Sequence, residues 1–243
     1  MKKAIFVFTM LCILSCTTSP GGRKQLLIMP KGQMDQMGQQ SFAQLKSQSR
    51  MLRSGAEYNW VTCTTNEILR AIGEKPSQWE IQLFVDDSPN AFALPGNKMG
   101  VHTGMTRLAG DTSELAAVIG HEIAHVKASH GNERVSQNMV VQGGVAVAGV
   151  AFGQSQQMNQ LIMAGLGIGV LMPFSRAHEK EADLLGLEYL VRAGYDPNGS
   201  VRLWRKMAKL GGRHARVLEH TPSFELPRWV FGRPHPKNEL SSQ

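Results

Sequence analysis

The sequence lacks any apolar run of the length that a membrane-spanning helix needs. Such a helix takes roughly 20 apolar residues, whereas the first run covers only 4–14. Two later stretches, 139–153 and 161–174, are each about 15 residues long and rich in glycine and alanine. For these two we expect core helices, the alternative being a hairpin that rests on lipid or on a partner.

The first apolar run has the features of an export signal, since two lysines precede it and a serine and a cysteine follow it. Residues 13–16 read Ile-Leu-Ser-Cys and resemble a bacterial lipobox, whose cysteine is lipidated and becomes the first mature residue. We therefore expect a lipoprotein signal peptide over 1–15 and lipidation of Cys16. The alternatives are an ordinary signal peptide with an incidental cysteine and, less favoured, an N-terminal membrane anchor that stays uncut. Thr17 is not the aspartate typical of inner-membrane retention, which favours the periplasmic face of the outer membrane.

Cysteine is scarce, with three in 243 residues. Cys12 belongs to the leader and Cys16 is the expected lipid acceptor, which leaves Cys63 as the mature chain's thiol. A monomer with one thiol has no internal disulfide framework. We expect Cys63 to be either buried or paired between chains.

Acidic residues are in mild deficit, with a formal net charge of +7, and the leader accounts for two of the lysines. Part of the surplus gathers in one segment, at Arg202, Arg205, Lys206, Lys209, Arg213 and Arg216. The favoured interpretation is a solvated helix face, the alternative being contact with anionic lipid or nucleic acid. Export argues against a nucleic-acid partner.

The chain is long enough for one domain with a full core. We expect three segments after the leader: a flexible tether over 16–32, a folded domain over 33–222 and an irregular tail over 223–243.

Helical periodicity predicts these helices: two within 33–70, then 112–130, 176–191 and 200–210. Period-two alternation and turn residues predict these strands: 79–85, 91–94 and 98–102. Asp111, three residues before Glu114, is the expected N-cap of the helix that Gly131 ends. These elements predict an α+β fold that is mainly helical, with a small sheet.

The helix expected at 112–130 carries the run His-Glu-Ile-Ala-His at 121–125. His121 and His125 are four residues apart, so both imidazoles project from one helix face, as two ligands of a tetrahedral zinc require. Glu122 lies beside them and is the candidate general base. A catalytic zinc site needs a third protein ligand, which another part of the chain has to supply.

A second motif, rich in acidic residues, lies at 175–183 on the helix expected at 176–191. It reads Ser-Arg-Ala-His-Glu-Lys-Glu-Ala-Asp. Glu179 and Asp183 are one turn apart on one face of that helix. Glu181 points about 200° away from Glu179 and is expected to face solvent. A carboxylate from this helix would complete a His, His, Glu set, with His178 and Glu181 as the rivals of Glu179.

The two motifs together resemble metallopeptidase family forty-eight, the gluzincin group of HtpX, BepA, LoiP and Oma. The resemblance covers roughly 33–207 and implies an α+β, mainly helical zincin-like metallopeptidase domain with a small sheet beside the active-site helix. It implies one Zn²⁺ ion held by three ligands, His121, His125 and Glu179. Asp183 then hydrogen-bonds a ligand histidine and fixes its tautomer, and Glu122 is the catalytic base.

The resemblance extends to a strand pair just before the zinc helix, at 90–96 and 101–104. In zincins such an edge strand holds an extended substrate by main-chain hydrogen bonds. The matching substrate-binding residues are Asn90, Ala91, Phe92 and Ala93. For the Phe92 side chain, packing within the sheet is an equally good explanation.

Other histidines receive no role in the site. His130 and Arg134 follow the zinc helix, but a helix-end histidine and an exposed arginine are commonplace. The family usually has Thr-His-Pro near its C-terminus, whereas this sequence has His220-Thr221-Pro222, so neither His220 nor His235 is placed at the metal.

The expected function is a zinc endopeptidase of the bacterial cell envelope that degrades misfolded or damaged envelope proteins. Its expected partners are unfolded envelope proteins and a membrane, reached through the lipid on Cys16. The alternative is a protease-like chaperone or assembly factor for outer-membrane proteins, whose zinc serves structure alone. An inert structural lipoprotein is a third possibility, which predicts no bound metal.

The lipobox generates a prediction for the exported protein. Mass spectrometry of the mature N-terminus is expected to show that the chain starts at Cys16 and carries the mass of a lipid group. A mature chain with an unmodified Cys16, or one cut elsewhere, would contradict the lipoprotein assignment.

Overall fold

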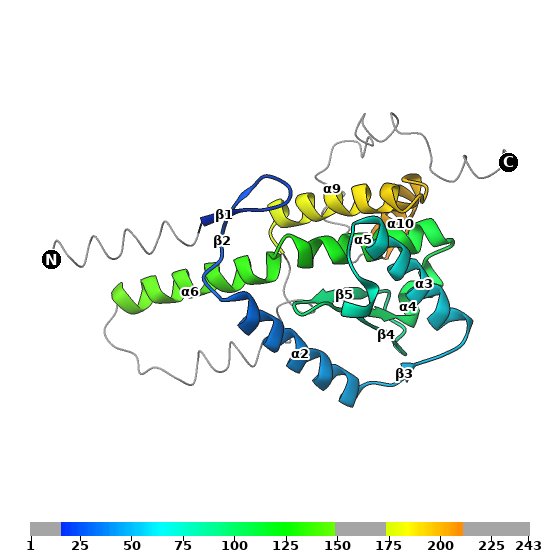
Figure 1. Cartoon of the computed structure of the whole chain (residues 1–243), viewed down its shortest axis with the longest axis horizontal. Helices are drawn as coiled ribbons and strands as arrows, with labels where there is room; N and C mark the ends of the chain where they lie inside the picture. The colour runs from blue at the N-terminus through cyan, green and yellow to red at the C-terminus, as the bar shows by residue number, and fades with distance from the viewer. Residues whose placement is uncertain (1–15, 149–173, 211–243) are drawn as a thin grey trace.

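The structure is a computed structural model that describes residues 16–148 and 174–210 (Figure 1). The helices are α2 (Lys31–Gln48), α3 (Ala56–Ala71), α4 (Thr103–Leu108), α5 (Thr112–Lys127), α6 (His130–Ala148), α9 (Arg176–Arg192) and α10 (Asn198–Lys209). The strands are β1 (Cys16–Thr18), β2 (Lys24–Leu26), β3 (Met51–Leu52), β4 (Glu80–Phe84), β5 (Ala91–Leu94) and β6 (Lys98–His102), with a 3-10 turn, η1 (Pro76–Gln78), before β4. The expected α+β fold is confirmed, as are the two helices within 33–70 and the three strands.

Helix α5 runs through the centre of the domain, and every residue from 114 to 125 is buried. Helices α3, α9 and α10 and strand β5 pack against it, and Figure 1 shows α9 lying alongside it. A helix that is surrounded on all sides is apolar all round except where polar groups find partners. Its two histidines are therefore held in the interior of the protein.

The start of α5 is capped as its sequence predicts. The Asp111 carboxylate accepts a hydrogen bond from the Glu114 N–H at 2.9 Å. The Glu114 carboxylate turns to the N–H of Gly110, at 2.8 Å, and is also paired with Arg202 and Lys206 of α10. These two basic residues of the C-terminal cluster therefore hold α10 against α5, while Arg213 and Arg216 lie outside the described residues.

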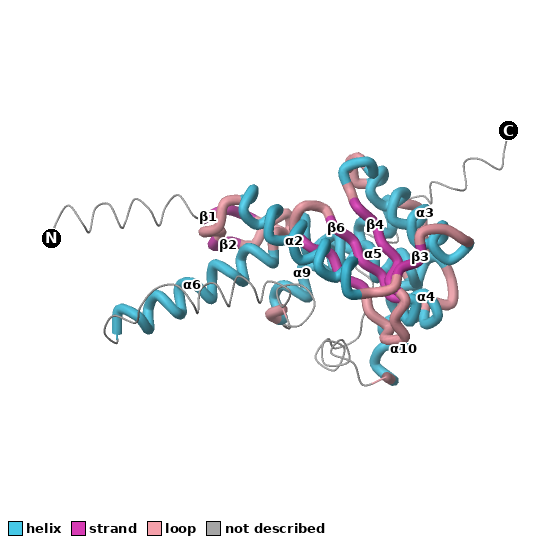
Figure 2. Tube along the Cα trace, turned by 90° about the horizontal axis from the view of Figure 1, so that it is seen from below, coloured by secondary structure: helices cyan, strands magenta, loops and turns pink. Residues whose placement is uncertain are grey.

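The sheet has the strand order β3-β4-β6-β5, in which β4 and β6 are parallel and β5 and β6 antiparallel. Figure 2 shows β4 and β6 of this sheet side by side. Figure 1 shows the sheet between α2 and α5. On the α2 face, Phe92 packs against Phe42 and Phe84. Gly100 lies opposite Phe92, and a Cβ there would come 2.2 Å from the phenylalanine ring. This cross-strand contact seats β5 against β6.

Helix α5 ends earlier than expected. The sequence predicts one helix to about His130 with Gly131 as its terminator, whereas α5 stops at Lys127 and Gly131 lies within α6. The break occurs at Ser129, whose φ is 55°. The left-handed backbone at a non-glycine residue interrupts the helix and lets α6 begin at once with His130.

The segment 16–32, expected to be a flexible tether, is packed against the domain. Strands β1 and β2 form an antiparallel hairpin, and its turn is closed by the Ser19 and Arg23 backbone at 2.8 Å. The Gln25 side chain is buried and donates to the Ala128 carbonyl at 2.6 Å. The composition of this segment predicts flexibility, and this prediction is wrong. The partners that hold its polar side chains are more than 100 residues away in the sequence, so local composition gives no sign of them.

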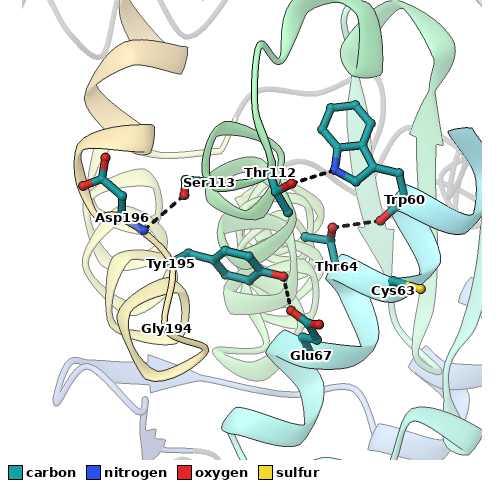
Figure 3. A pocket seen from close by; sticks show the side chains of 9 residues that line it. All are labelled: Trp60, Cys63, Thr64, Glu67, Thr112, Ser113, Gly194, Tyr195 and Asp196. Carbon is teal, nitrogen blue, oxygen red and sulfur yellow. Dashed lines mark hydrogen bonds between the residues drawn. The ribbon is translucent and has the colours of Figure 1, made fainter. Parts of the chain in front are cut away.

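A shallow hollow of about 490 Å³ lies between α3, the start of α5 and the turn before α10 (Figure 3). The Tyr195 hydroxyl donates to Glu67 there, and the Trp60 indole donates to Thr112 at 3.1 Å. Cys63 lies at this hollow and is exposed, so the expectation of a buried thiol is wrong. Pairing between chains stays a prediction.

None of the described helices is both long enough and apolar enough to cross a membrane. Of the two glycine-rich stretches, 139–148 belongs to α6, but most of the remainder lies outside the described residues. Helices α9 and α10 confirm the two helices expected at 176–191 and 200–210.

Helices α5 and α9 approach each other at a pair of glycines. A Cβ on Gly120 would lie 2.9 Å from the Gly186 carbonyl oxygen, and one on Gly186 would lie 2.7 Å from the His121 nitrogen. Both neighbouring atoms are backbone atoms that cannot move out of the way without shifting a helix. The two glycines therefore set the separation of the helices.

The glycine contact makes Gly186→Ala a test of this packing. We expect the free energy of unfolding, measured by urea denaturation, to fall by about 1–3 kcal/mol because the added methyl group overpacks the interface. Gly32→Ala in α2 is the control, since nothing lies within 4 Å of a Cβ there, and its stability should change by less than about 1 kcal/mol. Equal stabilities for the two variants would contradict the close approach.

Candidate metal centre

His121 and His125 form one side of the candidate centre on α5. Their imidazole Nε2 atoms are 3.0 Å apart and both rings are buried. The one-turn spacing predicted from the sequence is confirmed by this proximity. Both Nε2 atoms point to the same place, where α9 supplies the remaining groups.

Glu179 on α9 completes a cluster of three ligand atoms. One of its carboxylate oxygens lies 3.5 Å from His121 Nε2 and the other 3.8 Å from His125 Nε2. The three residues each offer an atom within 4.8 Å of the others. Among the described residues this is the one such group of histidine, cysteine or acidic side chains.

Ser175 positions Glu179 at the start of α9. The Ser175 hydroxyl accepts from the His178 N–H at 3.2 Å, which caps the helix and places Glu179 in its first turn. One turn later, the Asp183 carboxylate lies 3.0 Å from His121 Nδ1. Asp183 thus contacts the ring nitrogen that faces away from Glu179.

The chemistry of this cluster fits a divalent metal. Two imidazole nitrogens and one carboxylate oxygen are the ligand set of zinc sites that keep a position open. Burial disfavours a charged imidazole, yet hydrogen bonds to Asp183 and Glu179 hold the pKa of His121 well above its usual value. The two carboxylates therefore create a negative field at the point where the three ligand atoms converge, and a cation there would balance it.

Glu122 is buried on α5 beside the cluster. Burial raises the pKa of its carboxyl to about 7, and the nearby Glu179 acts in the same direction. A hydrogen bond from the Ala93 backbone, which acts in the opposite direction, links Glu122 to β5. A carboxyl group with a pKa near neutrality can both accept and return a proton.

Strand β5 presents its main chain to the site at two alanines. The Asn90 carbonyl accepts from the His102 N–H at 2.9 Å, so it points toward β6. Backbone groups alternate along an antiparallel strand, and those of Ala91 and Ala93 therefore point away from β6. Within the described residues β5 is an edge strand.

The Phe92 side chain is buried against Phe42 and Phe84. This contact supports packing within the sheet as the explanation for that side chain.

A cavity of about 420 Å³ adjoins His125 and Ala93. It lies between the N-terminal half of α2 and the end of α5, and its apolar lining includes Met29, Met34 and Phe174. The Phe174 ring stacks on the His125 imidazole, with centroids 4.2 Å apart and an interplanar angle of 21°. The cavity therefore reaches one of the three ligand residues, His125.

The two rival ligands lie on the other side of α9. His178 Nε2 is 3.1 Å from a Glu133 oxygen, and Glu181 is 3.1 Å from His130 Nε2. Glu181 is 7% exposed, so the expectation that it faces solvent is wrong. A helical wheel places it opposite Glu179 correctly, but the hairpin β1–β2 covers that face of the helix.

His130, to which the sequence assigns no role, lies beside the candidate ligands. It is fully buried, and its Nδ1 lies 3.0 Å from His125 Nδ1. Burial lowers the pKa of His130 to about 4, although Glu181 raises it, so the ring is neutral at pH 7. Periodicity could not place this side chain because it follows the break at Ser129. His220 and His235 lie outside the described residues.

Comparison with known proteins identifies relatives of this chain. Residues 56–240 match the model of peptidase family M48, which reaches further toward the C-terminus than the resemblance expected over 33–207. The mitochondrial metalloendopeptidase OMA1 of Schizosaccharomyces pombe is 34% identical over 75% of this chain and 54% of its own length. That of Arabidopsis thaliana is 36% identical over 55% of this chain and 27% of its own.

A bacterial relative is more distant. The β-barrel assembly-enhancing protease of Escherichia coli K12 is 24% identical over 81% of this chain and 42% of its own length. The chain thus spans between about a quarter and about half of the length of these relatives. The family match covers most of the sequence, and the motifs at 121–125 and 175–183 fall within it. The chain therefore belongs to peptidase family M48.

Proposed function

We propose that this chain is a zinc-dependent endopeptidase of the bacterial cell envelope that degrades misfolded or damaged envelope proteins. The observation that carries the proposal is the convergence of His121, His125 and Glu179 within 4.8 Å, with Glu122 beside them. Family membership supports the reaction class, since both kinds of relative are named as proteases.

In this proposal His121, His125 and Glu179 hold one Zn²⁺ ion. When bound, zinc polarises the scissile carbonyl and lowers the pKa of a water molecule to about 7. Glu122 takes the proton of the attacking water and returns it to the leaving amine, so no covalent intermediate with the protein forms. The Asp183 carboxylate, 3.0 Å from His121 Nδ1, favours the ring proton on that nitrogen, which leaves Nε2 free for the metal.

The substrate is held as an extended strand beside β5. The outward-facing N–H and carbonyl of Ala91 and the carbonyl of Ala93 are the pairing points, since the Ala93 N–H is bonded to Glu122. Asn90 and Phe92 direct their backbone groups to β6. The Ala93 backbone also contacts Glu122, so a strand paired there runs past the general base. The apolar cavity beside His125 accommodates a side chain of that strand. An extended, apolar segment is accessible in an unfolded protein and buried in a folded one.

The envelope location rests on the lipobox, with a lipid anchor on Cys16 at the periplasmic face of the outer membrane. Unfolded or misfolded envelope proteins are the proposed partners. The name of the Escherichia coli relative, which concerns β-barrel assembly, supports this setting. The same name favours a second candidate function, an assembly factor for outer-membrane proteins whose zinc is structural. Casein digestion with and without a chelator distinguishes the two, since only a peptidase loses cleavage when the chelator is added.

Substitution of Glu122 separates catalysis from metal binding. Glu122→Gln is expected to retain Zn²⁺ but to cleave casein and a denatured outer-membrane protein at least about 100-fold more slowly, because the general base is lost. His125→Ala is expected to lose both metal and cleavage. Metal content by elemental analysis and cleavage by gel are the two measurements.

Glu188→Gln is a matched control on α9, since Glu188 pairs with Arg192 away from the ligands. It should keep both properties. Cleavage at the normal rate by Glu122→Gln would end the peptidase mechanism, and a metal-free parent chain would end the zinc assignment.

A further inference from the structure

A buried cluster of charged and polar side chains lies behind the metal ligands, between α6, α9 and the N-terminal hairpin. It contains two histidines, two glutamates and one arginine: His130, His178, Glu133, Glu181 and Arg23. All but Arg23 are buried, and Arg23 is partly buried, with 27% of its side chain exposed. The mechanism proposed above uses none of these residues. Burying charged groups costs free energy unless they are paired, and each charged residue of this cluster is paired with another member.

The cluster connects to the metal site through one hydrogen bond. In the proposed site His125 uses Nε2 for the metal, so its one ring proton is on Nδ1. That nitrogen lies 3.0 Å from His130 Nδ1, which must then be the acceptor. An accepting Nδ1 carries no proton, so the ring proton of His130 is on Nε2, where it is donated to Glu181 at 3.1 Å. Binding of the metal at His125 Nε2 therefore determines the donor and the acceptor in both hydrogen bonds, from His125 to His130 and from His130 to Glu181.

Glu181 is held in turn by the hairpin β1–β2. The Gly21 N–H donates to one carboxylate oxygen at 2.9 Å, and the Arg23 Nε–H donates to the other at 3.0 Å. A Cβ at Gly21 would come 2.5 Å from the Glu181 oxygen. A side chain at position 21 would therefore displace the Glu181 carboxylate from its present place.

Arg23 also supports the face of the His130 ring. Its two terminal nitrogens bind both oxygens of Glu133, at 2.6 and 2.5 Å. Glu133 pairs with His178, whose ring stacks on His130 with centroids 4.6 Å apart. A planar guanidinium can serve two carboxylates in this way, whereas a lysine ammonium cannot match both geometries. Arg23 thus binds both Glu181, which contacts the edge of the His130 ring, and Glu133, which pairs with the histidine stacked on its face.

We propose that Arg23 is a positioning residue of the metal centre, which acts through Glu181 and His130 to orient the ring of His125. Each ligand histidine then has its own carboxylate support: Asp183 directly for His121, and Glu181 by way of His130 for His125. The N-terminal hairpin is accordingly part of the metal site. This inference rests on the proposed function, because it takes His125 to be a metal ligand.

The test compares two arginine variants of the full chain. Zn²⁺ affinity is measured by competition with a chromophoric chelator, and the geometry of the site by the visible spectrum of the Co²⁺-substituted protein. Arg23→Ala is expected to bind Zn²⁺ at least about tenfold more weakly and to show an altered Co²⁺ spectrum, since loss of such outer contacts costs 10–100-fold in affinity. Arg202→Ala is the control, because Arg202 also bridges several carboxylates but contacts none of the three ligands: its partners are Asp111, Glu114 and Asp196. Its affinity and spectrum should match the parent.

A His130→Ala background tests whether Arg23 acts through the chain of hydrogen bonds. With His130 removed, Arg23→Ala should cause little additional loss of affinity, because coupled residues are not additive. Arg23→Lys is measured in the same two backgrounds and should show the same pattern with a smaller loss, so the test stands if Arg23→Ala does not fold.

The inference is overturned if Arg23→Ala and Arg23→Lys bind Zn²⁺ as tightly as Arg202→Ala does, or if their losses are undiminished in the His130→Ala background. A parent chain that binds no Zn²⁺ would refute the proposed function itself. The two failures are therefore distinguishable by the parent measurement alone.

Discussion

The candidate metal centre depends on the close contact of two helices. His121 and His125 lie on α5, and Glu179 and Asp183 lie on α9, so the site exists only where these helices meet. Gly120 and Gly186 allow backbone to approach backbone at that point. A larger side chain at either position would move α9 away from the histidines, and carboxylate contacts of 3.0–3.8 Å would be lost.

The arrangement around α5 explains how a polar site is kept inside a small domain. The helix is buried from 114 to 125, and each of its polar groups has a partner from another element. The Asp183 carboxylate contacts His121, the Ala93 backbone donates a hydrogen bond to Glu122, and the His130 ring is hydrogen-bonded to His125. Because these partners come from a helix, a strand and the residues after a helix break, they fix the three side chains from different directions. Fixed ligands need little reorganisation when a metal binds.

The N-terminal hairpin adds a further layer to this arrangement. Arg23 and Gly21 satisfy the Glu181 carboxylate, and Gln25 reaches the Ala128 carbonyl near the end of α5. The hairpin begins at Cys16, the expected lipidation site. In a lipidated protein only a few residues would therefore separate the membrane anchor from the supports of the metal site. The peptidase centre and its attachment would share one structural element.

Local spacing in the sequence was sufficient to predict the histidine pair, the glutamate beside it, the Asp111 cap and the one-turn spacing of Glu179 and Asp183. Each of these relations spans at most four residues, and helix geometry alone determines it. The sequence did not show that Glu181 is buried, that His130 contacts His125, or that 16–32 packs on the domain. Those contacts join residues on opposite sides of a helix break or more than 100 positions apart, such as Arg23 with Glu133 and Glu181. Only the packing of the hairpin against α6 and α9 brings them together, because charge pairing at that distance along the chain has no periodic signal.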